Sequence, residues 1–214
     1  MGNQSSSIDQ TWFHVVRVRT NSPAYKASVE PFFDFITSAR PASMKEEELP
    51  DKPLQDIVQE HKDSAINLTI WSSKRQSYRD VQIIPSIGWN ELDSSLLGLT
   101  LRACDANRAV SSALDNVWHI LEVIEGSPAE SAGLVPYGDW VIGWPGGVLR
   151  QENDFYDLVE MHTDKPLRLY VYSFDFDTLR EVVLVPNRQW GGEGLLGCGV
   201  GFGLLHQIPV RPST

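Results

Sequence analysis

A β-rich α+β protein with two tandem domains is the fold class that this sequence predicts. The main evidence is an internal repeat, because residues 14–36 and 119–141 align at an offset of 105 with eight of 23 positions identical. Both copies begin with a run of β-branched and leucine residues that is typical of a buried strand. In addition, 42% of the 214 residues are hydrophobic, which is enough to form two packed cores.

Each copy continues from its first strand into a short helix. The motif Ser-Pro-Ala-x-x-Ala places Ser22 or Ser127 at the helix N-cap and a proline in the first turn. In the second copy Gly133 follows the helix and can adopt the left-handed conformation that ends it. The first copy has Ser28 at that place, which is a less favourable ending, so we expect the first domain to be the less stable of the two.

A second helix and a β-hairpin follow in both copies. An acidic loop with three prolines at 41–53 leads into apolar residues at helical spacing, and the same spacing returns 101 residues later. These apolar positions are Leu54, Ile57 and Val58 in the first copy and Phe155, Leu158 and Val159 in the second. Two strand patterns come next in each copy, at 66–73 and 78–85 and again at 167–174 and 180–186.

A Leu-Leu-Gly segment and a further strand close each copy. With the strand, the Ser-Pro-Ala helix and the Asp turn at the start, these segments resemble a PDZ domain. The resemblance implies a loop whose backbone N–H groups bind a terminal carboxylate, followed by an edge strand that accepts a peptide as an added strand. The first groove then comprises Leu96, Leu97, Gly98, Leu99 and Leu101, faced by Leu54, Ile57 and Val58. The second comprises Leu195, Leu196, Gly197, Cys198, Gly199 and Val200.

The order of these elements predicts a circular permutation. In an ordinary PDZ domain the carboxylate-binding loop and the strand after it come before the Ser-Pro-Ala segment. No such loop precedes His14, so each repeat is complete only if this loop and strand form its end. The last strand should then pair antiparallel with the first, which brings Cys104 beside His14. We therefore predict two circularly permuted PDZ-like domains. A flexible tail covers 1–12, the first domain 13–107 and the second 108–214, with the boundary between 105 and 116.

Charge and cysteine content restrict the function. The net charge is −10, and no stretch combines basic with aromatic residues, which argues against nucleic acid as a partner. Two cysteines at positions that are not equivalent in the repeat suggest a reducing compartment. No apolar run approaches the roughly 20 residues that span a bilayer, and the start of the chain lacks a secretory signal.

The first residues carry a lipidation signature. Gly2 after Met, with Ser6 at the fifth place of the processed chain, matches Met-Gly-x-x-x-Ser/Thr, the signature for N-myristoylation of Gly2. The alternative is a polar tail without modification. Because one myristoyl chain binds membranes only marginally, an acylated Gly2 needs a second attachment.

Several longer phrases make the resemblance more specific. They are residues 30–36 (EPFFDFI), 116–119 (NVWH), 165–172 (KPLRLYVY) and 190–199 (WGGEGLLGCG). Together with the two PDZ-like units and the Met-Gly start, they are similar to the Golgi reassembly and stacking proteins, the GRASP family. The likeness extends from Gly2 to Pro212.

The resemblance implies a membrane-tethering adaptor and no enzymatic activity. GRASP proteins lie on the cytosolic face of Golgi and early secretory membranes, held by the acylated glycine and a golgin partner, and they self-associate across apposed membranes. The family also acts in unconventional secretion. Here the resemblance implies that golgin carboxy-terminal segments bind the first groove and the cleft between the domains, and that the partners are a golgin, a second copy and the Golgi membrane.

A metal site shared with the partner is also implied. In some GRASP complexes a zinc ion joins a His and a Cys of the first domain to two golgin cysteines, and the matching residues are His14 and Cys104; otherwise no cofactor is required. The alternative is structural. His14 recurs as His119 while Gly203 stands where Cys104 would recur, and an unpaired cysteine is most often a small buried hydrophobe. The leucine grooves and Cys198 have a similar alternative, as internal packing.

Enzymatic interpretations find little support. Gly192, Gly194 and Gly197 match the dinucleotide-binding fingerprint, but strand-like sequence follows them instead of a helix. A thiol hydrolase using Cys104 and His14 would need an oxyanion site, for which no motif exists. The stronger alternative is a regulatory, protease-associated PDZ tandem that recognises the carboxy termini of other client proteins. Against it stand the missing protease domain, the missing signal peptide and the Met-Gly start.

Overall fold

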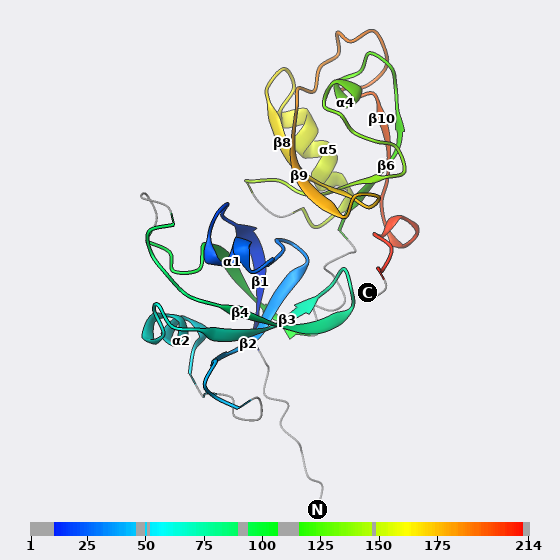
Figure 1. Ribbon diagram of the computed structural model, residues 1–214. Coiled ribbons are helices and arrows are strands. Elements are labelled where there is room, and N and C mark those ends of the chain that lie inside the picture. The colour runs from blue at the N-terminus through cyan, green and yellow to red at the C-terminus, as the bar shows by residue number, and fades with distance from the viewer. Residues whose placement is uncertain are drawn as a thin grey trace, which may run out of the picture. The chain divides into compact units, whose positions relative to one another are not determined.

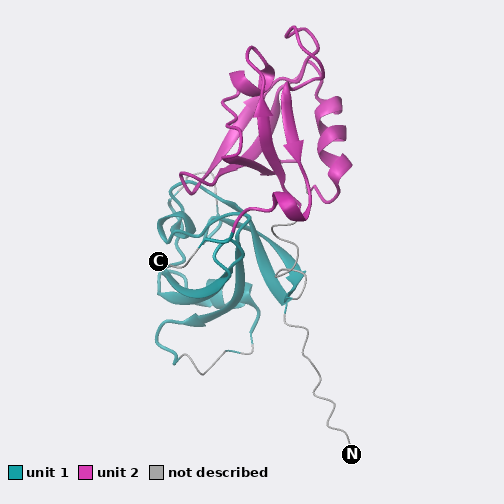
Figure 2. Ribbon diagram, turned by 90° about the vertical axis from the view of Figure 1, so that its right-hand side faces the viewer, with its two compact units in different colours: residues 1–113, 210–214 teal, residues 114–209 magenta. Residues whose placement is uncertain are grey.

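The computed structural model describes residues 11–45, 50, 52–89, 94–106, 116–146 and 149–211. Two five-stranded antiparallel sheets with a few short helices make up this part of the chain (Figure 1). Each sheet belongs to one of two compact units, which comprise residues 1–113 with 210–214 and residues 114–209 (Figure 2). The β-rich α+β class predicted from the sequence is confirmed.

The first unit has the sheet order β4-β3-β2-β1-β5. Its elements are β1 (Thr11–Val18), α1 (Pro23–Lys26), β2 (Asp34–Pro41), α2 (Leu54–Glu60), β3 (Ile66–Ser72), β4 (Ser77–Ile83) and β5 (Leu99–Asp105). Ser22 caps α1 by accepting a hydrogen bond from the Tyr25 amide at 3.1 Å, as the Ser-Pro-Ala motif predicts.

The second unit repeats this arrangement with the order β10-β6-β7-β8-β9. Its elements are β6 (Trp118–Val123), α4 (Pro128–Ser131), β7 (Asp139–Gly143), α5 (Glu152–Met161), β8 (Leu167–Ser173), β9 (Thr178–Leu184), β10 (Cys198–Gly201) and the 3₁₀ helix η1 (Leu204–His206). Ser127 caps α4 in the same way, with the Glu130 amide at 3.1 Å.

The closing strands pair as the predicted permutation requires. β5 runs antiparallel to β1, and β10 runs antiparallel to β6. Because each closing strand pairs on one side only, both lie at the edge of their sheet. Figure 1 labels β10 at the edge beside β6. An edge strand offers unpaired backbone groups to a further strand.

Each unit has its own hydrophobic core. The apolar face of α2 packs into the first core through Leu54, Ile57 and Val58, and that of α5 packs into the second through Phe155, Leu158 and Val159. The spacing of apolar residues in the sequence therefore predicts the buried faces of α2 and α5 correctly.

The ends of the units differ from the domain limits expected from the sequence. β1 begins at Thr11, and Trp12 is only 4% exposed, so these two residues belong to the sheet and not to the tail. At the other end, Val210 and Arg211 group with the first unit, where the Arg211 amide donates to the Lys74 carbonyl at 3.2 Å. A hydrogen bond between residues 137 positions apart leaves no local pattern in the sequence.

Candidate peptide-binding sites

The Leu-Leu-Gly loop of the first unit has its carbonyl groups bonded to the body of the domain. The bonds run from the Ser86 amide to Leu96 (2.9 Å), from the Ala24 amide to Leu97 (3.1 Å) and from the Arg19 amide to Gly98 (2.9 Å). In a planar trans peptide the N–H group points away from the carbonyl of the same unit. The amides of Leu97, Gly98 and Leu99 therefore point away from these bonding partners.

The second loop has the same geometry. The bonds run from the Asn187 amide to Leu195 (3.0 Å), from the Ala129 amide to Leu196 (3.0 Å) and from the Ile124 amide to Gly197 (2.9 Å). By the same reasoning, the amides of Leu196, Gly197 and Cys198 point outward. Successive outward N–H groups form a concave site that suits a carboxylate.

Glycine is required at the centre of both loops. Gly98 and Gly197 adopt positive φ angles of 73° and 66°. A Cβ atom on Gly98 would lie 2.2 Å from the Cβ of Ser22, and one on Gly197 would lie 2.3 Å from the Cβ of Ser127. The capped end of each short helix therefore packs directly against the loop, which explains why the Ser-Pro-Ala and Leu-Leu-Gly motifs occur together.

A tryptophan stabilises each loop, and sequence reasoning did not assign it this role. The indole N–H of Trp89 donates to the Ser95 carbonyl at 3.0 Å, and that of Trp190 donates to the Gly194 carbonyl at 3.1 Å. The two tryptophans lie 101 residues apart, the same offset as the helices and hairpins that precede them. This shared offset is the signal that could have identified them.

One hydroxyl group distinguishes the two loops. In the first unit the Gly98 amide donates to the Oγ of Ser95 at 2.9 Å, so one of its outward N–H groups already has an acceptor within the loop. In the second unit the equivalent residue is Gly194, which has no side chain. A carboxylate bound to the first loop must share this amide with Ser95 or displace the hydroxyl.

The residues predicted to line the grooves divide into a buried set and a partly exposed set. Leu54, Ile57, Val58, Leu96 and Leu97 are each 9% exposed or less and belong to the first core. Leu99 and Leu101 are only partly buried. In the second unit Leu196 is buried, and Leu195, Cys198 and Val200 pack partly exposed against the core. The leucines that precede each glycine therefore hold the loop in place, and the residues of the edge strand offer contact area.

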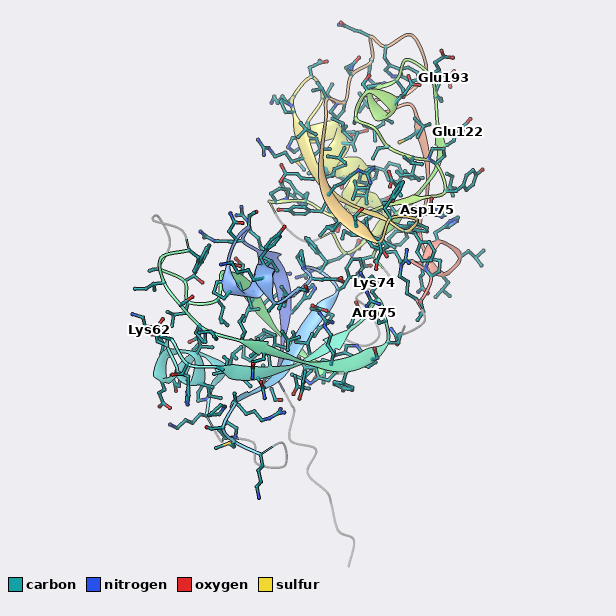
Figure 3. All side chains as sticks on the ribbon, viewed as in Figure 1. Lys62, Lys74, Arg75, Glu122, Asp175 and Glu193 are labelled. Carbon is teal, nitrogen blue, oxygen red and sulfur yellow. The ribbon has the colours of Figure 1, made fainter. Side chains whose placement is uncertain are left out.

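The sheet surface beside the two edge strands differs in charge. Arg17 on β1 pairs with Thr100 of β5. Glu122 on β6, which is labelled in Figure 3, pairs with Gly199 of β10. Both charged side chains are exposed. Peptides bound along β5 and along β10 would therefore meet charges of opposite sign.

Strand pairing brings the predicted metal ligands together. Cys104 is the register partner of Trp12, two residues from His14, and its thiol donates to the Trp12 carbonyl at 3.5 Å. Burial raises the pKa of the Cys104 thiol, and a hydrogen bond with the His14 backbone opposes that shift. The two residues are thus neighbours, as the permuted strand order predicts.

His14 itself is held on two sides. Its Nε2 lies 2.9 Å from the Phe32 carbonyl, and its ring stacks on Phe35 with centroids 4.4 Å apart. Burial lowers the pKa of His14, so the ring is neutral near pH 7. With Nε2 donating to the carbonyl, Nδ1 keeps the lone pair that a metal ion would need.

One nitrogen and one sulfur ligand fit half of a tetrahedral zinc site. Among the described residues no group of three or more His, Cys, Asp or Glu side chains could hold a metal ion, so His14 and Cys104 leave two positions open for ligands from a partner or from water. The second unit repeats only the histidine, because Gly203 replaces the cysteine. The Nε2 of His119 lies 3.2 Å from the Tyr137 carbonyl, and its ring stacks on Trp140. His119 thus makes the same two kinds of contact as His14 without a neighbouring cysteine, so these contacts also have a structural role.

A buried ion pair anchors the turn before the second strand of each unit, and sequence reasoning missed it. Asp34 and Asp139 have no exposed surface. Arg79 donates to both carboxylate oxygens of Asp34 at 2.9 and 2.5 Å, and Arg180 makes the same two bonds to Asp139. The acids are identical residues of the repeat and the arginines recur at an offset of 101, which was the available signal.

Comparison with protein families identifies the fold. A family described as the GRASP55/65 PDZ-like domain matches residues 68–211. The chain belongs to the GRASP family. The PDZ-like fold and the family resemblance predicted from the sequence are thereby confirmed. GRASP proteins are a non-enzymatic Golgi-stacking family, which agrees with the expectation that this chain is not an enzyme.

Individual GRASP relatives cover nearly the whole chain. Golgi reassembly-stacking protein 1 is 40% identical over 202 residues in both Mus musculus and Homo sapiens, which is 94% of this chain and 43% and 44% of those proteins. An uncharacterized protein of Schizosaccharomyces pombe is 36% identical over 212 residues, or 99% of this chain and 57% of that protein. The chain thus spans less than half the length of the two mammalian relatives. No helix among its described residues is long and apolar enough to cross a membrane.

Proposed function

We propose that this GRASP chain is a non-enzymatic adaptor that tethers Golgi membranes by binding golgin carboxy-terminal segments and by self-association. The observation that supports it most directly is a carboxylate loop of outward amides next to an edge strand, present once in each unit. Such a site takes a terminal carboxylate in the loop and the preceding residues as an added strand. Two such sites in one chain allow it to link two partners.

Peripheral attachment to the cytosolic face of the Golgi is part of the proposal. Gly2, the acylation site, lies outside the described residues. One acyl chain gives only reversible binding, so the golgin contact supplies the second attachment. A role in unconventional secretion would use the same peptide sites.

Self-association has a candidate surface in the second unit. Leu204 and Leu205 on η1 are 84% and 94% exposed. Adjacent leucines with so much exposed apolar area are typical of contact surfaces. Replacing both with serine should lower the apparent mass of the concentrated chain in sedimentation equilibrium, and an unchanged mass would move self-association to another surface.

Zinc shared with the golgin is the remaining element of the proposal. His14 Nδ1 and Cys104 Sγ would hold the ion, and two cysteines of the golgin would complete a tetrahedral set. The ion would fix the peptide to the first unit and would require the Cys104 thiolate. Because burial raises the pKa of that thiol, metal binding has to release its proton.

Calorimetry with a golgin carboxy-terminal peptide tests the adaptor function. We expect binding that weakens with a zinc chelator and with His14→Ala or Cys104→Ala. Binding indifferent to all three would support the groove and leave His14 and Cys104 as structural residues. A chain that binds no golgin peptide but binds other carboxy termini would favour the alternative, a regulatory PDZ tandem of the protease-associated type.

A further inference from the structure

A turn after β10 brings a second histidine back onto the sheet of the second unit. Gly203, with φ of 90°, precedes η1 and permits the turn. The His206 ring then lies on the backbone of Gly201, where an added Cβ would be 2.4 Å from its Cε1 and Nδ1 atoms. The indole N–H of Trp140 donates to the His206 carbonyl at 2.8 Å. His206 is therefore positioned both by the absence of a side chain at Gly201 and by a hydrogen bond.

This position places His206 beside His119. Gly201 is the register partner of His119 across β10 and β6, so a ring lying on Gly201 faces the His119 side chain. The centroids of the two imidazoles are 5.8 Å apart, and the rings are inclined at 55°. Both residues are partly exposed, so an ion can reach them from solvent.

Two contacts hold the His119 ring in place. It stacks on Trp140 with centroids 4.1 Å apart and an angle of 5° between the planes. Its Nε2 lies 3.2 Å from the Tyr137 carbonyl, which fixes the proton on Nε2 and leaves the lone pair on Nδ1. Burial lowers the pKa of His119, with a smaller contribution from nearby His206, so the neutral form dominates near pH 7.

We propose that His119 and His206 form a binding site for a divalent transition-metal ion of the zinc class. With zinc–nitrogen bonds of about 2.0–2.1 Å, two imidazoles on one tetrahedral ion have ring centroids roughly 5–6 Å apart. The separation observed here falls in that range. Water fills the remaining positions in the isolated chain. The site is separate from the His14 and Cys104 pair and does not depend on peptide binding.

Zinc titration of the full chain, followed by NMR of the imidazole Cε1–H signals, tests this site. A His14→Ala background removes the histidine of the first unit. We expect the His119 and His206 signals to shift together and saturate at one ion per chain, while magnesium, which prefers oxygen ligands, leaves them unchanged. Losing one ligand through His206→Ala should weaken zinc binding more than about tenfold.

His162→Ala is the matched control. His162 lies in the same unit, but its Nδ1 bonds to the Leu158 carbonyl at 2.8 Å and its ring packs against Trp144, away from the proposed site. This variant should bind zinc like the background. If His206→Ala leaves the affinity unchanged, or if zinc shifts all histidine signals equally without saturating, the proposal is wrong.

Discussion

The two units have the same backbone but place different side chains on it. Residues with positive φ recur at equivalent places, including Asn21 (63°) and Gly126 (74°), and Ser28 (56°) and Gly133 (73°). In the second unit these two places hold glycine, which adopts such angles without strain. In the first unit they hold residues with a Cβ atom, for which the left-handed region costs free energy. The repeat thus conserves a conformation and not the residue that adopts it most easily.

A similar contrast occurs at the turn between the hairpin strands. In the first unit Lys74, which is labelled in Figure 3, is only 2% exposed. Its ammonium group pairs with Glu30 at 2.7 Å and lies 5.2 Å from the Phe33 ring centroid. In the second unit the equivalent residue is Asp175, next to Gly138. The first unit therefore buries a cation where the second has an acid. In contrast, the loops, the loop tryptophans and the Asp–Arg pairs occur in both units.

Removing the arginine of an Asp–Arg pair should have the largest effect on stability. Comparing the two variants tests whether the two pairs are equivalent. Arg79→Ala should destabilise the first unit by about 3 kcal/mol, because Asp34 remains buried without its partner. Arg180→Ala should destabilise the second unit equally. Hydrogen exchange resolved by residue measures both. If only one of the two variants weakens protection in its own unit, the two pairs have different roles.

The next effect concerns the left-handed residue after each short helix. Ser28→Gly should stabilise the first unit by about 1 kcal/mol, and the matched change Gly133→Ser should destabilise the second by about 1 kcal/mol. The unmodified chain should show weaker hydrogen-exchange protection in the first unit than in the second. Equal protection in both units would remove the expectation that the first is less stable.

A smaller effect is expected in the affinity of the two loops for a peptide carboxylate. Ser95→Gly removes the hydroxyl that accepts from the Gly98 amide, so the first loop should bind a carboxylate a few-fold more tightly, in keeping with a hydrogen bond worth about 1 kcal/mol. Ser95→Ala, which removes the same hydroxyl, is the matched control and should bind like Ser95→Gly; Gly194 is left unchanged because its φ of 77° would strain a serine. Calorimetry with one carboxy-terminal peptide compares all three chains. No change in either variant would mean that Ser95 does not compete with the ligand.

The smallest expected effect is a dependence of stability on pH. Burial lowers the pKa of His14 in the folded state below its unfolded value of about 6.5, so the unfolded chain binds the proton more strongly. The first unit should therefore lose stability as pH falls below about 6.5. His14→Gln should flatten this part of the profile in urea unfolding followed by NMR. A profile unchanged by the substitution would assign the loss to other groups.

Features that depend on the spacing of nearby residues could be predicted from the sequence. Features that depend on contacts between side chains far apart in the sequence could not. The repeat, the buried faces of α2 and α5 and the closing strands all follow from apolar spacing and motif order. The bond between Arg79 and Asp34 joins residues 45 positions apart and has no local pattern. Likewise, an apolar residue such as Leu97 fits a groove or a core equally well, and only packing shows that it is 6% exposed and part of the core.

Peptide binding as proposed depends on the outward amides of the carboxylate loop in each unit. The most direct measurement is NMR of the backbone amides while a golgin carboxy-terminal peptide is added, compared with the same peptide carrying a carboxamide end. We predict that the free carboxylate shifts the amides of Leu97, Gly98 and Leu99, of Leu196, Gly197 and Cys198, or of both loops, and that the carboxamide does not. Equal shifts with both peptides, or shifts confined to residues outside the two loops, would contradict this account.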